Sequence, residues 1–170
     1  MRIGISGHQN IGCPETVDWV RQQMLQYLRT HDISAGVSSL AVGADQLFAS
    51  AVVERKIPLE VVIPCDRYEA TFTDSEALAN YRALLNAAAT KRVLNFMEPS
   101  EEAFLQAGRL VVDSSDAMVL VWDGNPAAGR GGTGDIAKYA SARGRSYFWI
   151  NPRNTTSSNV RVTGTEVRHT

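Results

Sequence analysis

The sequence has few of the features that mark a secreted or membrane protein. Two cysteines among 170 residues, Cys13 and Cys65, are too few for a disulfide framework, and we expect both to be reduced thiols. No run approaches the roughly 18 consecutive apolar residues that a membrane-spanning helix requires, and no secretory signal opens the chain. These absences predict a cytoplasmic protein without a membrane partner.

An excess of charge of either sign is also missing. Seventeen lysines and arginines stand against eighteen acidic residues, for a net charge of −1. The chain as a whole therefore has no electrostatic attraction to nucleic acid, which argues against nucleic acid as a partner. The three histidines and two cysteines show no clustered spacing, so no metal site is predicted. The Gly-Lys-Ser/Thr ending of a P-loop is absent, which argues against a Walker-type ATPase.

What the chain does have is an alternation of short apolar runs with stretches of helical periodicity. The expected strands span residues 2–6, 35–40, 59–63, 92–96, 117–122 and 146–150. This alternation predicts an α/β fold of the Rossmann-like, doubly wound type, with a mainly parallel six-stranded sheet and helices on both faces.

Residues 1–150 are expected to form a single nucleotide-binding domain, and residues 151–170 a polar C-terminal extension. By composition alone the extension would be disordered. The extension could pack either on its own domain or on a second copy of the chain. The second alternative would make the protein a homo-oligomer.

Three loops leave the carboxyl ends of the expected strands and so lie on the same side of the sheet. They are residues 7–12, residues 41–45 and the glycine-rich residues 127–135. Parallel sheets bind ligands outside these ends, near the point where the strand order reverses. We therefore expect the three loops to line one cleft, with both cysteines near its rim.

The third loop stands between a buried strand and a helix, which is an arrangement that binds phosphate through backbone N–H groups and the helix dipole. Thr133 adds a hydroxyl at the expected helix start, and Asp135 adds a carboxylate in the first turn. We predict that the amides of residues 131–134 hold a phosphate and that no lysine, metal or other cofactor is required. The alternative is an ordinary glycine-rich surface loop.

Several polar side chains near these loops have two open interpretations. Asp45 and Asp135 each either stabilise a helix N-terminus or contact a ribose. His8 either contacts the ligand or is bonded within its own loop. Arg109 either pairs with a phosphate or is solvated, and Arg130 has the better position because it lies within the glycine loop.

Three large aromatic side chains fall in apolar patterns and are expected in the core. They are Phe48, Phe104 and Trp122.

Five short motifs occur in an order that resembles the SLOG superfamily, most closely its YpsA-like branch. They are Ser6-Gly7-His8, Val42-Gly43-Ala44-Asp45, Val62-Ile63-Pro64-Cys65, Val112-Asp113-Ser114-Ser115-Asp116 and Gly131-Gly132-Thr133. The resemblance covers residues 2–142, and the superfamily also contains the LOG phosphoribohydrolases and the DNA-processing protein DprA. It implies a Rossmann-like fold whose strand-end loops bind a nucleotide or a nucleotide derivative.

LOG enzymes cleave the N-glycosidic bond of nucleoside monophosphates with the motif P-G-G-x-G-T-x-x-E. Here Ala128 and Arg130 replace the proline and the second glycine. Ile136 replaces the glutamate, with Asp135 one residue earlier and about 100° away around the helix. These departures put LOG-type hydrolysis in doubt but leave phosphate binding by backbone amides intact.

The preferred interpretation is thus a nucleotide-binding sensor, carrier or regulator. The alternative is a nucleotide N-glycosidic hydrolase with Asp135, Asp45 or Arg109 as candidate catalytic residues, and a DprA-like single-stranded DNA binder is a third possibility. The predicted nucleotide-binding residues are Ser6, Gly7, His8, Gln9, Gly43, Ala44, Asp45, Pro64, Arg109, Arg130, Gly131, Gly132, Thr133, Gly134 and Asp135.

Overall fold

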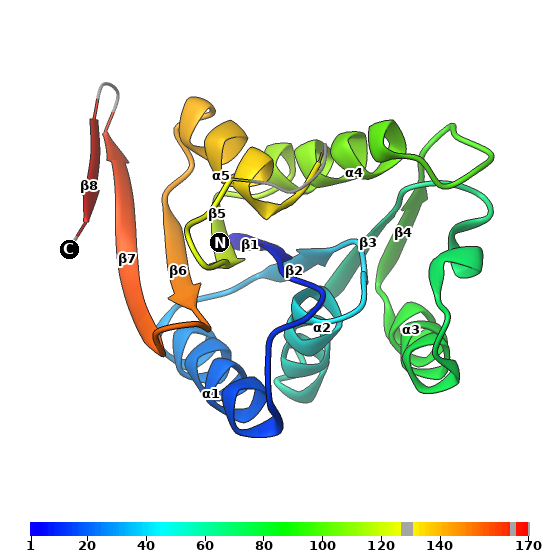
Figure 1. The fold of residues 1–170 in the computed structure, drawn as a ribbon, viewed down its shortest axis with the longest axis horizontal. Helices are drawn as coiled ribbons and strands as arrows, with labels where there is room; N and C mark the ends of the chain where they lie inside the picture. The colour runs from blue at the N-terminus through cyan, green and yellow to red at the C-terminus, as the bar shows by residue number, and fades with distance from the viewer. Residues whose placement is uncertain (127–130, 164–165, 170) are drawn as a thin grey trace.

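A computed structural model describes residues 1–126, 131–163 and 166–169 and has a twisted sheet at its centre (Figure 1). The strands are β1 (Arg2–Gly7), β2 (Ala35–Ser38), β3 (Leu59–Ile63), β4 (Thr90–Val93), β5 (Ala117–Val121), β6 (Tyr147–Asn151), β7 (Thr156–Thr163) and β8 (Glu166–His169). The helices are α1 (Pro14–Thr30), α2 (Ala44–Glu54), the 3-10 turn η1 (Tyr68–Thr71), α3 (Ser75–Ala87), α4 (Glu101–Asp113) and α5 (Thr133–Ala142).

The strand order is β4-β3-β2-β1-β5-β6-β7-β8. Strands β1 to β6 pair in parallel, which confirms the Rossmann-like, mainly parallel fold. The expected number of six strands was wrong, because β7 and β8 extend the sheet with antiparallel pairs. The order reverses between β1 and β5, so the chain winds outward from this pair in both directions.

The five α-helices cover both faces of the sheet. In Figure 1, α1, α2 and α3 lie on one face and α4 and α5 on the other. Strand β5, Ala-Met-Val-Leu-Val, is buried at all five positions because it packs against both helical layers. None of the helices in the described part of the chain combines the length and apolar character of a membrane span.

Strand β4 lies two residues earlier than expected, at Thr90–Val93 instead of residues 92–96, and all four of its residues are exposed. The apolar side chains of Leu94 and Phe96 lie just beyond it, where the N–H of Phe96 bonds back to the carbonyl oxygen of Leu94 and turns the chain. An exposed edge strand needs no apolar side chains, so the sequence pattern predicts the strand at the apolar stretch that follows it.

The C-terminal tail is held by its own domain. Strand β7 pairs with β6 along five residues, and the buried Val160 belongs to the core under α4 and α5. On the other side, the hydroxyl of Ser157 donates a 2.8 Å hydrogen bond to Gln23 of α1. The tail is polar in composition because most positions of β7 other than Val160 are exposed.

Because Val160 is buried and its neighbour Arg161 is exposed, the two residues form a matched pair for testing the tail. We expect Val160→Ala to lower the free energy of unfolding by about 2 kcal/mol, from lost apolar burial and a residual cavity. Arg161→Ala should change it by less than about 0.5 kcal/mol. Urea unfolding of both variants measures this, and equal effects would contradict a packed tail.

Candidate functional site

A cavity of about 730 Å³ opens at the carboxyl ends of β1 and β5, where the strand order reverses. Its volume lies within the range of about 300–1,000 Å³ that is usual for small-molecule sites. The predicted binding residues that line it are Ser6, Gly7, His8, Gln9, Asp45, Pro64, Gly131, Gly132, Thr133 and Gly134. The prediction that three loops line one cleft is thereby confirmed for the described residues. Gly129 and Arg130, which were also expected at this cleft, lie outside the residues that the structure describes.

Four predicted binding residues do not line this cavity. Gly43 lines a separate, smaller pocket, and the buried Ala44 donates its N–H to the carbonyl oxygen of His8 at 3.1 Å. Arg109 stacks over the ring of Tyr139 on α5, with its Cζ 5.2 Å from the ring centroid. The carboxylate of Asp135 accepts the N–H of Gly131 at 3.0 Å. Asp135 therefore shapes the glycine loop from outside the cavity.

Two glycines allow the loops to approach one another closely. Gly43 has a φ of 87°, and a Cβ there would collide with the carbonyl oxygen of Gln9. Gly131 has a φ of 85°, and a Cβ there would lie 3.0 Å from the backbone nitrogen of Leu105 on α4. Any other residue at either position would have an unfavourable backbone angle and too little space for its Cβ.

Helix α5 begins inside the cavity wall. Gly132 is its N-cap, and Thr133 is its first residue. The first N–H groups of a helix have no partner within the helix. Among the described residues, no hydrogen bond uses the amides of Gly132, Thr133 or Gly134. The positive end of the dipole of α5 thus borders the cavity, at a position that favours an anion.

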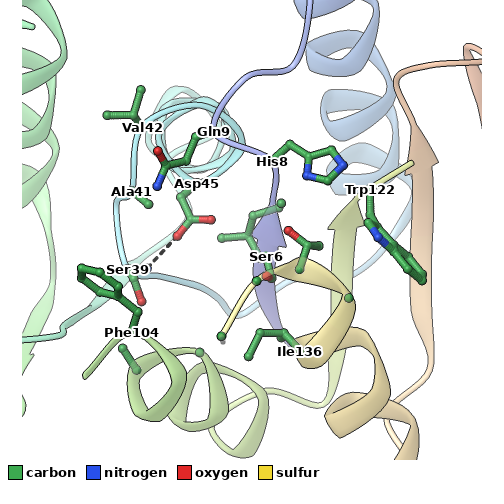
Figure 2. Close-up of a pocket in the computed structure, with 18 of the residues that line it drawn as sticks. Ser6, His8, Gln9, Ser39, Ala41, Val42, Asp45, Phe104, Trp122 and Ile136 are labelled. Carbon is green, nitrogen blue, oxygen red and sulfur yellow. Dashed lines mark hydrogen bonds between the residues drawn. The ribbon is translucent and has the colours of Figure 1, made fainter. Parts of the chain in front are cut away.

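Asp45 projects into the cavity from the first turn of α2 (Figure 2). Its carboxylate accepts the backbone N–H of Ser39 at 3.2 Å, while only 7% of the residue is exposed. Burial raises the pKa of Asp45 to about 7, despite the hydrogen bonds from the loop that favour the charged form. Asp45 is thus a carboxyl group that exchanges its proton near neutral pH.

His8 and Asp123 form a second polar pair in the wall. The Nε2 of His8 lies 3.2 Å from Oδ1 of Asp123 and also 3.2 Å from the backbone nitrogen of Asp123. The backbone N–H of Asn125 donates to the same carboxylate and holds the pKa of Asp123 below its usual range. The ring of His8 is therefore bonded to the loop after β5 and not within its own loop, and it still borders the cavity.

The expectation that Phe104 belongs to the core was wrong, whereas Phe48 is fully buried as expected. Phe104 is 37% exposed and lines the cavity. Trp122 packs against the core, as expected, but it is only partly buried and also lines the cavity. Trp122 directly follows the last residue of β5, and this position at a strand end is the signal that could have identified it.

Aromatic side chains close the cavity near Phe104. The ring centroid of Tyr68 lies 5.4 Å from that of Phe72 and 6.4 Å from that of Phe104. Tyr68 is only 4% exposed, and desolvation, followed by the charge of Asp45, raises its pKa. The sequence signal for Tyr68 was its place in the irregular segment after β3.

The lining is acidic. Asp45, Glu101 and Asp123 line the cavity, and none of the described lining residues is lysine or arginine. Among the residues that the structure describes, no group of three or more His, Cys, Asp or Glu side chains is arranged to hold a metal ion.

Both cysteines are free thiols, as expected, but neither lines the cavity. Cys13 is exposed beside α1, and its Sγ lies 3.3 Å from the hydroxyl of Thr16. Cys65 is buried in the core, and burial raises the pKa of its thiol. The expectation of two thiols at the rim was therefore wrong, because the side chain that follows Pro64 points inward.

No protein-family model matches this chain, and no curated protein matches it. Among solved structures, DNA processing protein A (DprA) from Streptococcus pneumoniae superposes with a TM-score of 0.62 and 17% identity, covering 88% of this chain and 50% of that one. DprA from Helicobacter pylori, which has a unique single-stranded DNA binding mode, superposes with a TM-score of 0.61 and 16% identity, covering 91% and 70%.

At this level of identity the likeness shows a shared fold. This is the fold that the SLOG resemblance predicts, since DprA is one of the groups in that superfamily. The chain spans half the length of the S. pneumoniae protein.

The buried carboxyl group of Asp45 makes stability depend on pH. Its pKa is about 7 in the folded protein, against 3.8 ordinarily, so the folded state binds the proton more tightly. Stability should fall as pH rises from about 4 to about 7, by at most roughly 4 kcal/mol from this group. Asp45→Asn should remove this slope and stabilise the protein by about 1–3 kcal/mol at pH 8. Urea unfolding of both proteins from pH 5 to pH 8 tests this prediction. If Asp45→Asn is less stable than the wild type at pH 8, burial does not raise the pKa of Asp45.

Proposed function

We propose that the chain is a cytoplasmic nucleotide-binding protein, acting as a sensor, carrier or regulator, whose ligand occupies the cavity between β1 and β5. The observation that carries this proposal is that the amides of Gly132, Thr133 and Gly134 border a cavity of about 730 Å³ and make no hydrogen bond within the part of the chain that the structure describes. Backbone donors at a helix N-terminus bind phosphate without a lysine or a metal.

Asp45 supports a ribose or base contact on the other side of the same cavity. Its Oδ2 accepts the N–H of Ser39, the loop residues Ser38 and Ala41 also hydrogen-bond to the carboxyl group, and Asp45 lines the cavity. Keeping a carboxyl group buried where it destabilises the fold is typical of a functional residue. In this role Asp45 accepts a hydrogen bond from a ligand hydroxyl or amine.

Membership of the SLOG superfamily, and of its YpsA-like branch in particular, is part of this proposal. So is the possibility of N-glycosidic hydrolysis, for which Asp45 is the better candidate acid, because Asp135 is bonded to Gly131 outside the cavity. Single-stranded DNA binding is favoured by the fold shared with H. pylori DprA. The acidic lining of the cavity disfavours it, since strand binding relies on a basic groove.

Thermal unfolding with a panel of nucleosides, nucleotides and a single-stranded oligonucleotide separates these functions. A nucleotide at 100 times its Kd should stabilise the protein by roughly 2.7 kcal/mol. Release of free base from a bound nucleotide would establish the hydrolase. Stabilisation by the oligonucleotide alone, lost steeply with salt, would replace the proposal by strand binding.

Gly132 provides the sharpest test of the phosphate contact. Its φ of −68° and ψ of 169° suit any residue, so Gly132→Val adds bulk among the amides without backbone strain. We expect this variant to weaken nucleotide binding at least tenfold. Thr133→Ala should have a smaller effect, because it removes one hydroxyl worth about 0.5–1.5 kcal/mol, or up to roughly 3 kcal/mol to a charged group.

Calorimetry of both variants in the presence of EDTA measures these effects. Ser75→Val, at the exposed first position of α3 and outside the cavity, is the matched control and should bind as the wild type does. Unchanged affinity in Gly132→Val, or loss of binding caused by EDTA alone, would refute the phosphate contact.

A further inference from the structure

The cavity has two separate aromatic walls. Figure 2 shows Phe104 and Trp122 at opposite ends of the pocket, with Ser6 of β1 and Ile136 of α5 between them. The two rings come from different elements, since Phe104 lies in the first turn of α4 and Trp122 follows β5. A ligand with one planar group leaves one of these walls unused.

The Trp122 wall is fixed in place by hydrogen bonds and by a second indole. Its Nε1–H donates to the carbonyl oxygen of Asn125 at 2.7 Å, and its own carbonyl oxygen accepts the Nε1–H of Trp149 at 2.8 Å. The centroids of the two indoles lie 5.9 Å apart. Trp122 therefore presents a rigid flat surface, on which stacking costs little conformational entropy.

The Phe104 wall is an apolar ring left partly in solvent. Phe104 is 37% exposed, while its partner Tyr68 is almost fully buried beneath it. Val42, on the loop after β2, is 36% exposed and lines the same cavity. An accessible ring in a cavity wall, supported by a second ring, is suited to stacking with a planar heterocycle.

Charge limits what can lie between the two walls. The amides of Gly132–Gly134 offer donors for an anion there, yet the described lining adds only the carboxyl groups of Asp45, Glu101 and Asp123. A terminal phosphate carries a charge of about −1.5 to −2 at pH 7. A phosphodiester carries a single negative charge and meets less repulsion from these carboxyl groups.

Resting on the proposed nucleotide function, we infer that the ligand is a dinucleoside monophosphate unit. One base stacks on Phe104, the other stacks on Trp122, and the phosphodiester between them binds the amides at the start of α5. The unit is a free dinucleotide, because the acidic lining of the cavity disfavours a longer strand.

Calorimetry with the dinucleoside monophosphates ApA, GpG, CpC and UpU, and with their 5′-mononucleotides, tests the inference. The tightest dinucleoside should bind at least tenfold more tightly than its own mononucleotide. Phe104→Leu and Trp122→Leu, which keep an apolar side chain without a flat face, should each weaken that dinucleoside by roughly 5- to 100-fold. The mononucleotide should respond to only one of the two substitutions.

The matched control is Met97→Ala, since Met97 is 69% exposed and does not line the cavity. This variant should bind as the wild type does. Trp122→Phe and Phe104→Tyr keep a flat ring and should restore most of the affinity, which a merely structural role of either residue would not predict. Thermal unfolding confirms that each variant is folded.

Equal affinity for dinucleoside and mononucleotide, or a folded leucine variant that binds the dinucleoside unchanged, overturns this inference alone. Absence of binding by every compound overturns the proposed function as well. A twelve-nucleotide strand tests whether the ligand is a polymer. Tighter, salt-dependent binding of the strand overturns both this inference and the proposed function, and an affinity no higher than that of the dinucleoside supports a free dinucleotide.

Discussion

The parallel pairing of β1 with β5 is the constraint on which the site depends. Ile5 pairs with Val119 and Gly7 with Val121, so both strands end at the same level. The N–H of His8 then donates to the carbonyl oxygen of Val121, which fixes the first loop to the end of β5. The helices that follow these two strands lie on opposite faces of the sheet (Figure 1), and the loops at the strand ends line the cavity together with the N-terminal parts of α2, α4 and α5.

The polar groups around this space are arranged to recognise a ligand at some cost to stability. Within the described residues, the cavity lining offers Asp45 no lysine or arginine, and the first amides of α5 have no partner. A fold selected only for stability would pair the buried carboxyl group and cap the helix. Instead, Asp135 accepts the N–H of Gly131, and the next three amides have no partner in that part of the chain.

The alternation of apolar runs with helical periodicity was enough to predict the parallel sheet and the convergence of three loops, because strand direction alone determines both. It could not place Arg109 or Asp135, since a side chain's direction depends on helical rotation and on neighbours such as Tyr139. Periodicity alone places Phe104 and Trp122 in the core, because it does not show where the covering layer stops. Polar strands, such as β4 at the edge and β7 beside β8, have too few apolar residues for their pattern to stand out.

Strand β7 also covers the edge of β6. Without it, β6 would present the free N–H and C=O groups of Tyr-Phe-Trp-Ile-Asn to solvent, and such a strand readily pairs with other chains and aggregates. Ser158 of β7 lies opposite Trp149 of β6, whose indole donates to the carbonyl oxygen of Trp122. The tail thus covers the edge of β6 and, through the side chain of Trp149, supports the wall of a cavity that none of its described residues lines.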